Sequence, residues 1–132
     1  MDSLMVRQVE EFHRVFGLPI IEKPSLAPEE RYRLRYSLIF EELCEFADAI
    51  RDEDIVAVAD ALGDLIYVVI GAALEYGIPL DDVVDEIHRS NMSKLDENGK
   101  PIYRESDGKV LKGENYSPPN LEEVLGIERI TE

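Results

Sequence analysis

Five carboxylates stand in two short stretches of the chain at spacings that favour metal-ion chemistry. Glu41, Glu42 and Glu45 come first, and Asp60 and Asp64 follow in the next apolar segment. Residues three or four apart share one face of a helix, so each stretch would present its carboxylates side by side. Carboxylates gathered at reduced dielectric repel one another by an energy on the order of several kcal/mol. A hard divalent cation removes this repulsion, and Mg²⁺ prefers oxygen ligands and is typically shared with substrate phosphates.

Asp64 carries the strongest signal of the five. It interrupts an apolar stretch, and no Lys or Arg occurs between residues 55 and 76. A carboxylate inside an apolar helix is costly unless it is paired or binds a metal. No cluster of His or Cys accompanies the carboxylates, which disfavours zinc. The sequence therefore predicts a Mg²⁺ site, with Mn²⁺ as the alternative ion.

Each of these residues also has a simpler interpretation. Glu41 and Glu42, taken alone, are typical of a solvated helix face. Asp60, near the start of a helix, would complement the helix dipole. Asp64 would be a structural group if it paired with an arginine such as Arg35. The metal hypothesis therefore depends on the joint arrangement of the carboxylates.

The elements that must position these side chains are helices. Apolar residues recur at helical spacing up to Phe16, and residues 18–28 contain three prolines and form a loop. Asp54 is a suitable N-cap and Gly77 a suitable C′ glycine for the most apolar helix. Asn120 would cap a short final helix. We expect the three main helices at residues 29–51, 55–76 and 80–94.

The segment after residue 94 changes character. Asp-Glu-Asn-Gly at 96–99 and Ser-Asp-Gly-Lys at 106–109 favour turns, and short apolar pieces lie beside them. This pattern predicts a small β-hairpin followed by an extended C-terminal tail. Residues 89–113 also carry six Lys and Arg against four Asp and Glu in a chain whose net charge is −15. We therefore expect a phosphate contact in this basic segment.

The short connection at residues 51–54 makes the two carboxylate-bearing helices antiparallel. Glu45 should then face residues near 60, and Glu41 or Glu42 should face residues near 64. The predicted fold is all-α, an antiparallel four-helix bundle in a single domain of residues 1–132. Because the helix at 55–76 is apolar on more than one face, four short helices cannot cover it, and we expect a homodimer or a dimer of dimers.

Charge and composition exclude several classes of partner. A net charge of −15 disfavours a nucleic-acid polymer or an anionic membrane surface. The single cysteine permits no intrachain disulfide, and the chain start lacks a basic segment followed by an apolar one. The longest uninterrupted apolar stretch, residues 65–74, is too short to span a bilayer. We expect a cytoplasmic protein.

The segments 41–45 and 60–67 together resemble the MazG-like all-α nucleoside triphosphate pyrophosphohydrolase superfamily. It includes phosphoribosyl-ATP pyrophosphohydrolases and dimeric dUTPases, and its signature is Glu-x-x-Glu on one helix and Glu-x-x-Asp on the next. Glu42 and Glu45 match the first half, whereas Ala61 stands where the second half has Glu, with Asp60 one residue earlier as its substitute. The resemblance extends over residues 30 to 120.

This resemblance implies a Mg²⁺-dependent hydrolysis of a nucleoside triphosphate between its α and β phosphates. Glu41, Glu42, Glu45 and Asp64, with Asp60 as the substitute ligand, would hold the ion. Glu41 or Glu42 would orient or deprotonate the attacking water. On the following helix, Lys94 would contact phosphate and Asn91 would contact sugar or base.

Tyr67 and the identity of the substrate stay open at this point. Tyr67 lies near the face of Asp64, where it would stack on a base or, twice as often, pack as a half-buried core tyrosine. The alternative activity is that of a phosphoribosyl-ATP pyrophosphohydrolase. A different class is a non-catalytic acidic helical module that binds a divalent ion or a protein partner. By family analogy, the physiological role would be removal of non-standard nucleotides.

Overall fold

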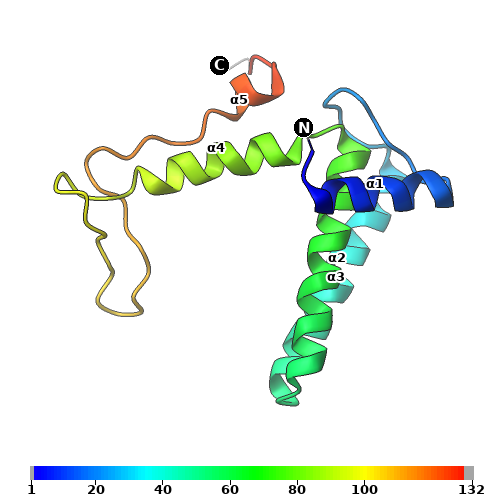
Figure 1. Cartoon of the computed structure of the whole chain (residues 1–132), viewed down its shortest axis with the longest axis horizontal. Helices are drawn as coiled ribbons and strands as arrows, with labels where there is room; N and C mark the ends of the chain where they lie inside the picture. The colour runs from blue at the N-terminus through cyan, green and yellow to red at the C-terminus, as the bar shows by residue number, and fades with distance from the viewer. Residues whose placement is uncertain (1, 130–132) are drawn as a thin grey trace. The chain divides into compact units, whose positions relative to one another are not determined.

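The computed structural model describes residues 2–129, and its regular elements are α-helices. They are α1 (Leu4–Phe16), α2 (Glu29–Arg51), α3 (Ile55–Tyr76), α4 (Leu80–Met92) and the short α5 (Leu121–Leu125) (Figure 1). The prediction of an all-α protein is confirmed. The chain forms two compact units, residues 1–80 and residues 81–132.

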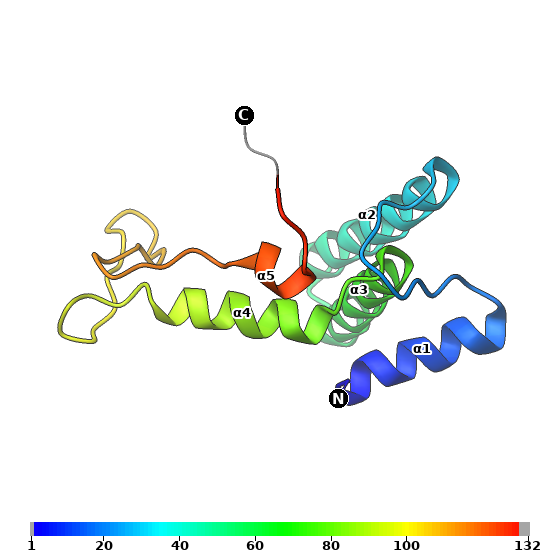
Figure 2. The ribbon, with the colours of Figure 1, turned by 90° about the horizontal axis from the view of Figure 1, so that it is seen from above.

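The N-terminal unit, residues 1–80, is built on the antiparallel pair α2 and α3. The two helices lie side by side, and α1 crosses α3 near one end of the pair (Figures 1 and 2). The connection at residues 52–54 is short because Glu53 takes the left-handed conformation, with φ of 53°. Asp54 then caps α3, its Oδ1 accepting hydrogen bonds at 3.1 Å from the backbone N–H groups of Val56 and Ala57. These local features fix the antiparallel direction.

A small apolar core joins α1 to the C-terminal half of α3. Val6, Val9, Ile70 and Leu74 form it, and Leu80 packs against it. Gly77 ends α3 with φ of 66°, and a Cβ at this position would lie 2.3 Å from the carbonyl oxygen of Lys23. The loop before α2 therefore folds closely over the end of α3, and glycine is required there.

Much of α3 is apolar but not covered within this unit. By length and composition alone it is the one helix among the described residues that could cross a membrane, and 17% of its most apolar 18-residue window is buried. One such helix is weak evidence for a membrane span, because the core helix of a soluble protein passes the same test. Asp60 and Asp64 lie within it, and aspartate is costly at the centre of a bilayer.

The C-terminal unit, residues 81–132, consists of α4, a returning loop and α5. Ser93 joins the two ends of the loop, since its Oγ accepts a hydrogen bond of 2.8 Å from the N–H of Ser117. At the start of α5, Asn120 accepts from the N–H of Glu123 at 3.3 Å and donates its own N–H to Glu86 at 2.6 Å. The predicted cap at Asn120 is confirmed.

The prediction of a β-hairpin in this loop is wrong. Within residues 2–129 the loop contains an isolated antiparallel bridge between Tyr103 and Val110 and no strand. The pairing does not continue beyond this bridge, because the backbone groups that would extend it form hydrogen bonds with other residues. The carbonyl of Lys100 accepts from the N–H of Asp96 at 2.7 Å, and the N–H of Gly113 donates to the carbonyl of Lys94 at 2.8 Å.

Candidate metal centre

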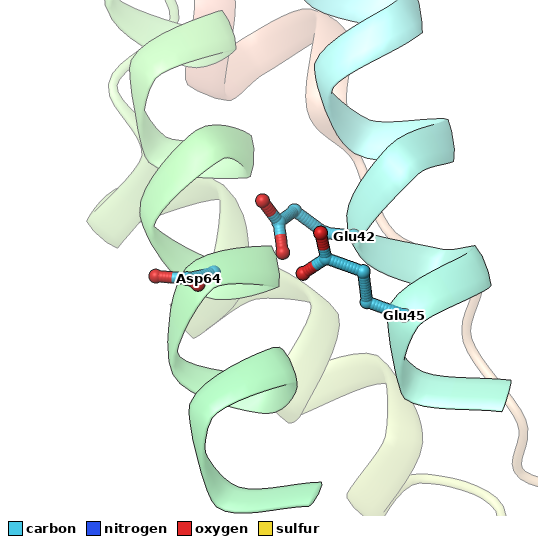
Figure 3. A group of neighbouring side chains, drawn as sticks. All are labelled: Glu42, Glu45 and Asp64. Carbon is cyan, nitrogen blue, oxygen red and sulfur yellow. The ribbon is translucent and has the colours of Figure 1, made fainter. Parts of the chain in front are cut away.

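Three of the predicted carboxylates meet between α2 and α3. Glu42 and Glu45 on α2 and Asp64 on α3 each offer one oxygen, and these oxygens all lie within 4.8 Å of one another. Figure 3 shows both glutamates extending from α2 toward α3 at the level of Asp64. We call this group the carboxylate cluster. It places Glu42 opposite residue 64, as the short connection predicts.

The electrostatics of the cluster are unfavourable without a cation. The pKa of Glu42 rises from its ordinary 4.5 to about 7, chiefly because the carboxyl group is removed from water. The neighbouring Glu45 raises that pKa further, and Asp64 and Asp60 add smaller effects. The Oε2 atom of Glu42 is buried and has no hydrogen-bond partner among the described residues. An orphaned, buried carboxylate oxygen is what a bound cation would satisfy.

No basic side chain of residues 2–129 forms an ion pair with the cluster. Arg35, the alternative partner of Asp64, pairs with Glu75 instead. The donor set consists only of carboxylate oxygens, which suits Mg²⁺ or Mn²⁺ rather than zinc. Glu45 is exposed and Asp64 is not buried, so water and substrate oxygens have access to an ion held there.

The other two acidic residues lie beside the cluster rather than within it. Glu41 is exposed and does not belong to the group of three. Asp60 is also exposed, one turn before Asp64, and is close enough to raise the pKa of Glu42. Ala61, where the family signature has Glu, is 2% exposed and packs inside the unit. The side chain at that position therefore supplies packing rather than a ligand.

The predicted substrate residues fall in both units. Tyr67 is 38% exposed, and its ring packs nearly perpendicular to that of Phe12, with 5.6 Å between the centroids. Asn91 is exposed and Lys94 is half-buried, and both belong to the C-terminal unit. Their roles toward a substrate stay predictions.

A second group of charged side chains joins α2 and α3, and the sequence patterns did not predict it. Arg31 Nε and Nη2 donate to Glu75 Oε1 and Oε2 at 2.7 and 2.8 Å, and Arg35 Nη1 lies 3.3 Å from Glu75 Oε2. We call Arg31, Arg35 and Glu75 the arginine cluster. The hydrogen bond that Arg31 donates to Glu75 raises the pKa of Arg31, whereas burial lowers the pKa of Arg35. Two arginines one turn apart on α2, and one acidic residue in the last turn of an apolar helix, were the available sequence signal.

Fold and site together define an all-α protein with a carboxylate centre on a pair of antiparallel helices. The sequence model of the phosphoribosyl-ATP pyrophosphohydrolase family matches residues 9–91, which include all of α2 and α3. The chain therefore belongs to this family of pyrophosphohydrolase enzymes.

The chain is also similar to a curated protein and to a solved structure. Uncharacterized protein L479 of Acanthamoeba polyphaga mimivirus is 33% identical over 99 residues, a match that covers 72% of this chain and 37% of that relative. The chain thus spans well under half of that curated protein. The crystal structure of a candidate NTP pyrophosphohydrolase from Exiguobacterium sp. 255-15 is similar with a TM-score of 0.50 at 26% identity, and the match covers 92% of each chain.

Proposed function

We propose that the protein is a Mg²⁺-dependent nucleoside triphosphate pyrophosphohydrolase. It would cleave between the α and β phosphates and release a nucleoside monophosphate and pyrophosphate. The observation that supports this most is the carboxylate cluster, in which three acidic groups meet without a basic partner among the described residues. Family membership and the similarity to the Exiguobacterium protein support a substrate with a phosphoric anhydride bond.

In this proposal Glu42, Glu45 and Asp64 hold the ion, and Asp60, one turn before Asp64 on α3, adds a further oxygen. Bound Mg²⁺ supplies positive charge toward the phosphate oxygens and the leaving pyrophosphate. Glu41 stands next to the ligands in an exposed position, which suits a carboxylate that orients the attacking water or accepts its proton. Glu42 is the alternative base, through a carboxylate oxygen that the ion does not use.

The substrate contacts come from the family resemblance. Lys94 would act as a positive charge on phosphate, and Asn91, one turn before it on α4, would contact sugar or base. Tyr67 would stack on the nucleobase only with the exposed part of its ring, because Phe12 contacts the ring on one side. Residues 89–113, the basic segment of an otherwise acidic chain, extend this contact surface.

We also propose that the active form is a homodimer or a dimer of dimers that completes a helical bundle. Ile55 and Val56 on α3 are 77% and 75% exposed, and large apolar side chains line the outer face of α2 as well. We expect the protein in the cytoplasm, and a soluble monomer rarely exposes so extended an apolar face to water. A second copy of the chain would cover this face. A monomer in sedimentation at micromolar concentration would contradict this assembly.

A second candidate substrate is phosphoribosyl-ATP, which the description of the matching family favours. One panel separates the candidates: pyrophosphate release from the common and non-standard nucleoside triphosphates and from phosphoribosyl-ATP, each with Mg²⁺ and with EDTA. Release from nucleoside triphosphates that requires Mg²⁺ is the expected result. Release from phosphoribosyl-ATP alone would favour the second candidate. No release from any compound would favour a non-catalytic metal-binding module.

A further inference from the structure

The carboxylate cluster requires a fixed register between α2 and α3. Two ligands lie on α2 and one on α3, so a slide or rotation of one helix would separate their oxygens. The carboxylates cannot hold this register themselves, because they repel one another before an ion arrives. At one end of the pair the short connection at residues 52–54 joins the helices. The opposite end needs a separate link.

The arginine cluster is the polar link between these helices on that side. The Glu75 side chain is 1% exposed and that of Arg35 is 7% exposed, so both groups are buried. Arg35 also donates Nη2 to the backbone carbonyl of Val68 at 2.7 Å. Val68 lies one turn, about 6 Å, above Asp64 along α3, and Arg35 lies two turns, about 10 Å, from Glu42 along α2. The arginine therefore ties the two helices close to the carboxylates.

The Arg35 guanidinium occupies space that the missing side chain of Gly71 leaves open. A Cβ at Gly71 would lie 2.2 Å from Arg35 Nη2 and 3.1 Å from His13 Nε2. The His13 ring is 1% exposed, and its Nδ1 lies 2.9 Å from the carbonyl oxygen of Pro19. The guanidinium and a histidine held by the following loop thus both lie against Gly71 of α3. The Nε atom of Arg35 is buried and has no hydrogen-bond partner among the described residues, so the bonds to Glu75 and Val68 do not use all of the guanidinium donors.

We propose that Arg35 is a positioning residue for the metal centre, an inference that rests on the proposed function. By bridging Glu75 and the Val68 carbonyl, it holds Glu42 and Glu45 at the level of Asp64. A buried ion pair is weak evidence for net stability but can specify one arrangement of the helices. Mg²⁺ demands near-ideal octahedral geometry, so a small error in register should weaken its binding. Gly71 serves the same purpose by leaving room for the guanidinium.

Gly71→Ala is the sharpest test, because it displaces Arg35 without removing any charged group. Gly63→Ala is the matched control on the same helix, since a Cβ at Gly63 meets nothing within 4 Å. Mg²⁺ affinity is measured by calorimetry on the full chain, with circular dichroism as the check of folding. We expect Gly71→Ala to bind Mg²⁺ about tenfold more weakly, the low end of losses when groups that support metal ligands are changed. Gly63→Ala should bind as the wild type does.

Arg35→Met gives an independent second variant. Glu75 keeps its two hydrogen bonds from Arg31, so no buried charge is left unpaired. We expect a similar loss of Mg²⁺ affinity, and no further loss when Gly71→Ala and Arg35→Met are combined, because both act through one guanidinium. Val9→Ala in the apolar core is the comparison for plain destabilisation, and its Mg²⁺ affinity should equal that of the wild type.

Each outcome separates this proposal from the proposed function. A wild type that does not bind Mg²⁺ would overturn the proposed function and the positioning role with it. Wild-type binding that both variants retain in full would overturn the positioning role alone. An equal loss in Val9→Ala, additive losses in the double variant, or loss of the helical signal in both single variants would assign the cluster to general stability and overturn it too.

Discussion

The carboxylate cluster and the arginine cluster lie on the same two helices and differ in how their charges are compensated. In the arginine cluster, Glu75 is 1% exposed and bound by two guanidinium groups. In the carboxylate cluster, Glu42 faces other acids and leaves a buried oxygen unpaired. A protein gains no stability from the second arrangement by itself. The contrast teaches that the charges of the arginine cluster are compensated within the fold, whereas those of the carboxylate cluster are not compensated by any described side chain and, in the proposed function, await a cation.

Removal of Glu75 should produce the largest effect. Glu75→Ala leaves the buried Arg35 without its carboxylate, and breaking a buried pair in this way costs about 3–5 kcal/mol of unfolding free energy. Urea denaturation with EDTA measures the loss. Glu75→Gln, which can still accept hydrogen bonds from Arg31, is the control and should lose less. An unchanged unfolding free energy in Glu75→Ala would remove the distinction between the two clusters.

Asp64→Asn should separate activity from stability. As a lost metal ligand it should reduce pyrophosphate release roughly a hundredfold or more, beyond the losses from groups that merely support ligands. Without metal its melting temperature should stay level or rise, because repulsion on Glu42 is relieved. Added Mg²⁺ should stabilise the wild type by mass action and the variant much less. A metal-independent loss of stability with activity retained would mean that Asp64 is structural.

The pH dependence of stability should distinguish the clusters next. The pKa of Glu42 is about 7 in the folded protein against an ordinary 4.5, so the folded state binds more protons between these values. The metal-free protein should therefore lose stability as pH rises from about 5 to about 7, and change little through Glu42 above that. Melting curves with EDTA across this range measure the slope.

Two comparisons check that Glu42 causes this slope. Glu42→Gln should flatten it, because the amide does not titrate. Saturating Mg²⁺ should oppose it, since the ion competes with the proton for the same carboxylates. A slope that persists unchanged in Glu42→Gln would assign the titration to another group.

The smallest effect should come from the cap at the connected end of the helices. Asp54→Ala removes the acceptor for the N–H groups of Val56 and Ala57 and should cost about 1 kcal/mol of unfolding free energy. Its Mg²⁺ affinity should stay at the wild-type value, because the backbone connection still joins the helices. Denaturation and calorimetry together test this. A loss of Mg²⁺ affinity as large as that of Gly71→Ala would move the control of register to this end.

Local sequence features predicted the helices well. The expected bounds 29–51 and 55–76 coincide with α2 and α3, with Asp54 and Gly77 at the expected caps. The helix expected at 80–94 ends at Met92, because Ser93 turns back to bond the carbonyl of Ser90. Periodicity and capping are short-range properties, so they can be read along the chain. The expected hairpin was wrong because its hydrogen-bonding groups pair with Lys94 and Asp96 outside the two predicted strands.

The sequence by itself determined that carboxylates of α2 and α3 would meet near residues 42 and 64, because helical spacing and a short connection make the two helices antiparallel; the structure then selects Glu42, Glu45 and Asp64. Only the tertiary structure decided which charges are compensated. Whether Arg35 faces Asp64 or Glu75 depends on the rotation of α2 about its axis and on the gap at Gly71 that admits the guanidinium. The same packing turned Ala61 inward and left Asp60 exposed. Contacts between residues far apart in the chain set these rotations, and no local pattern records them.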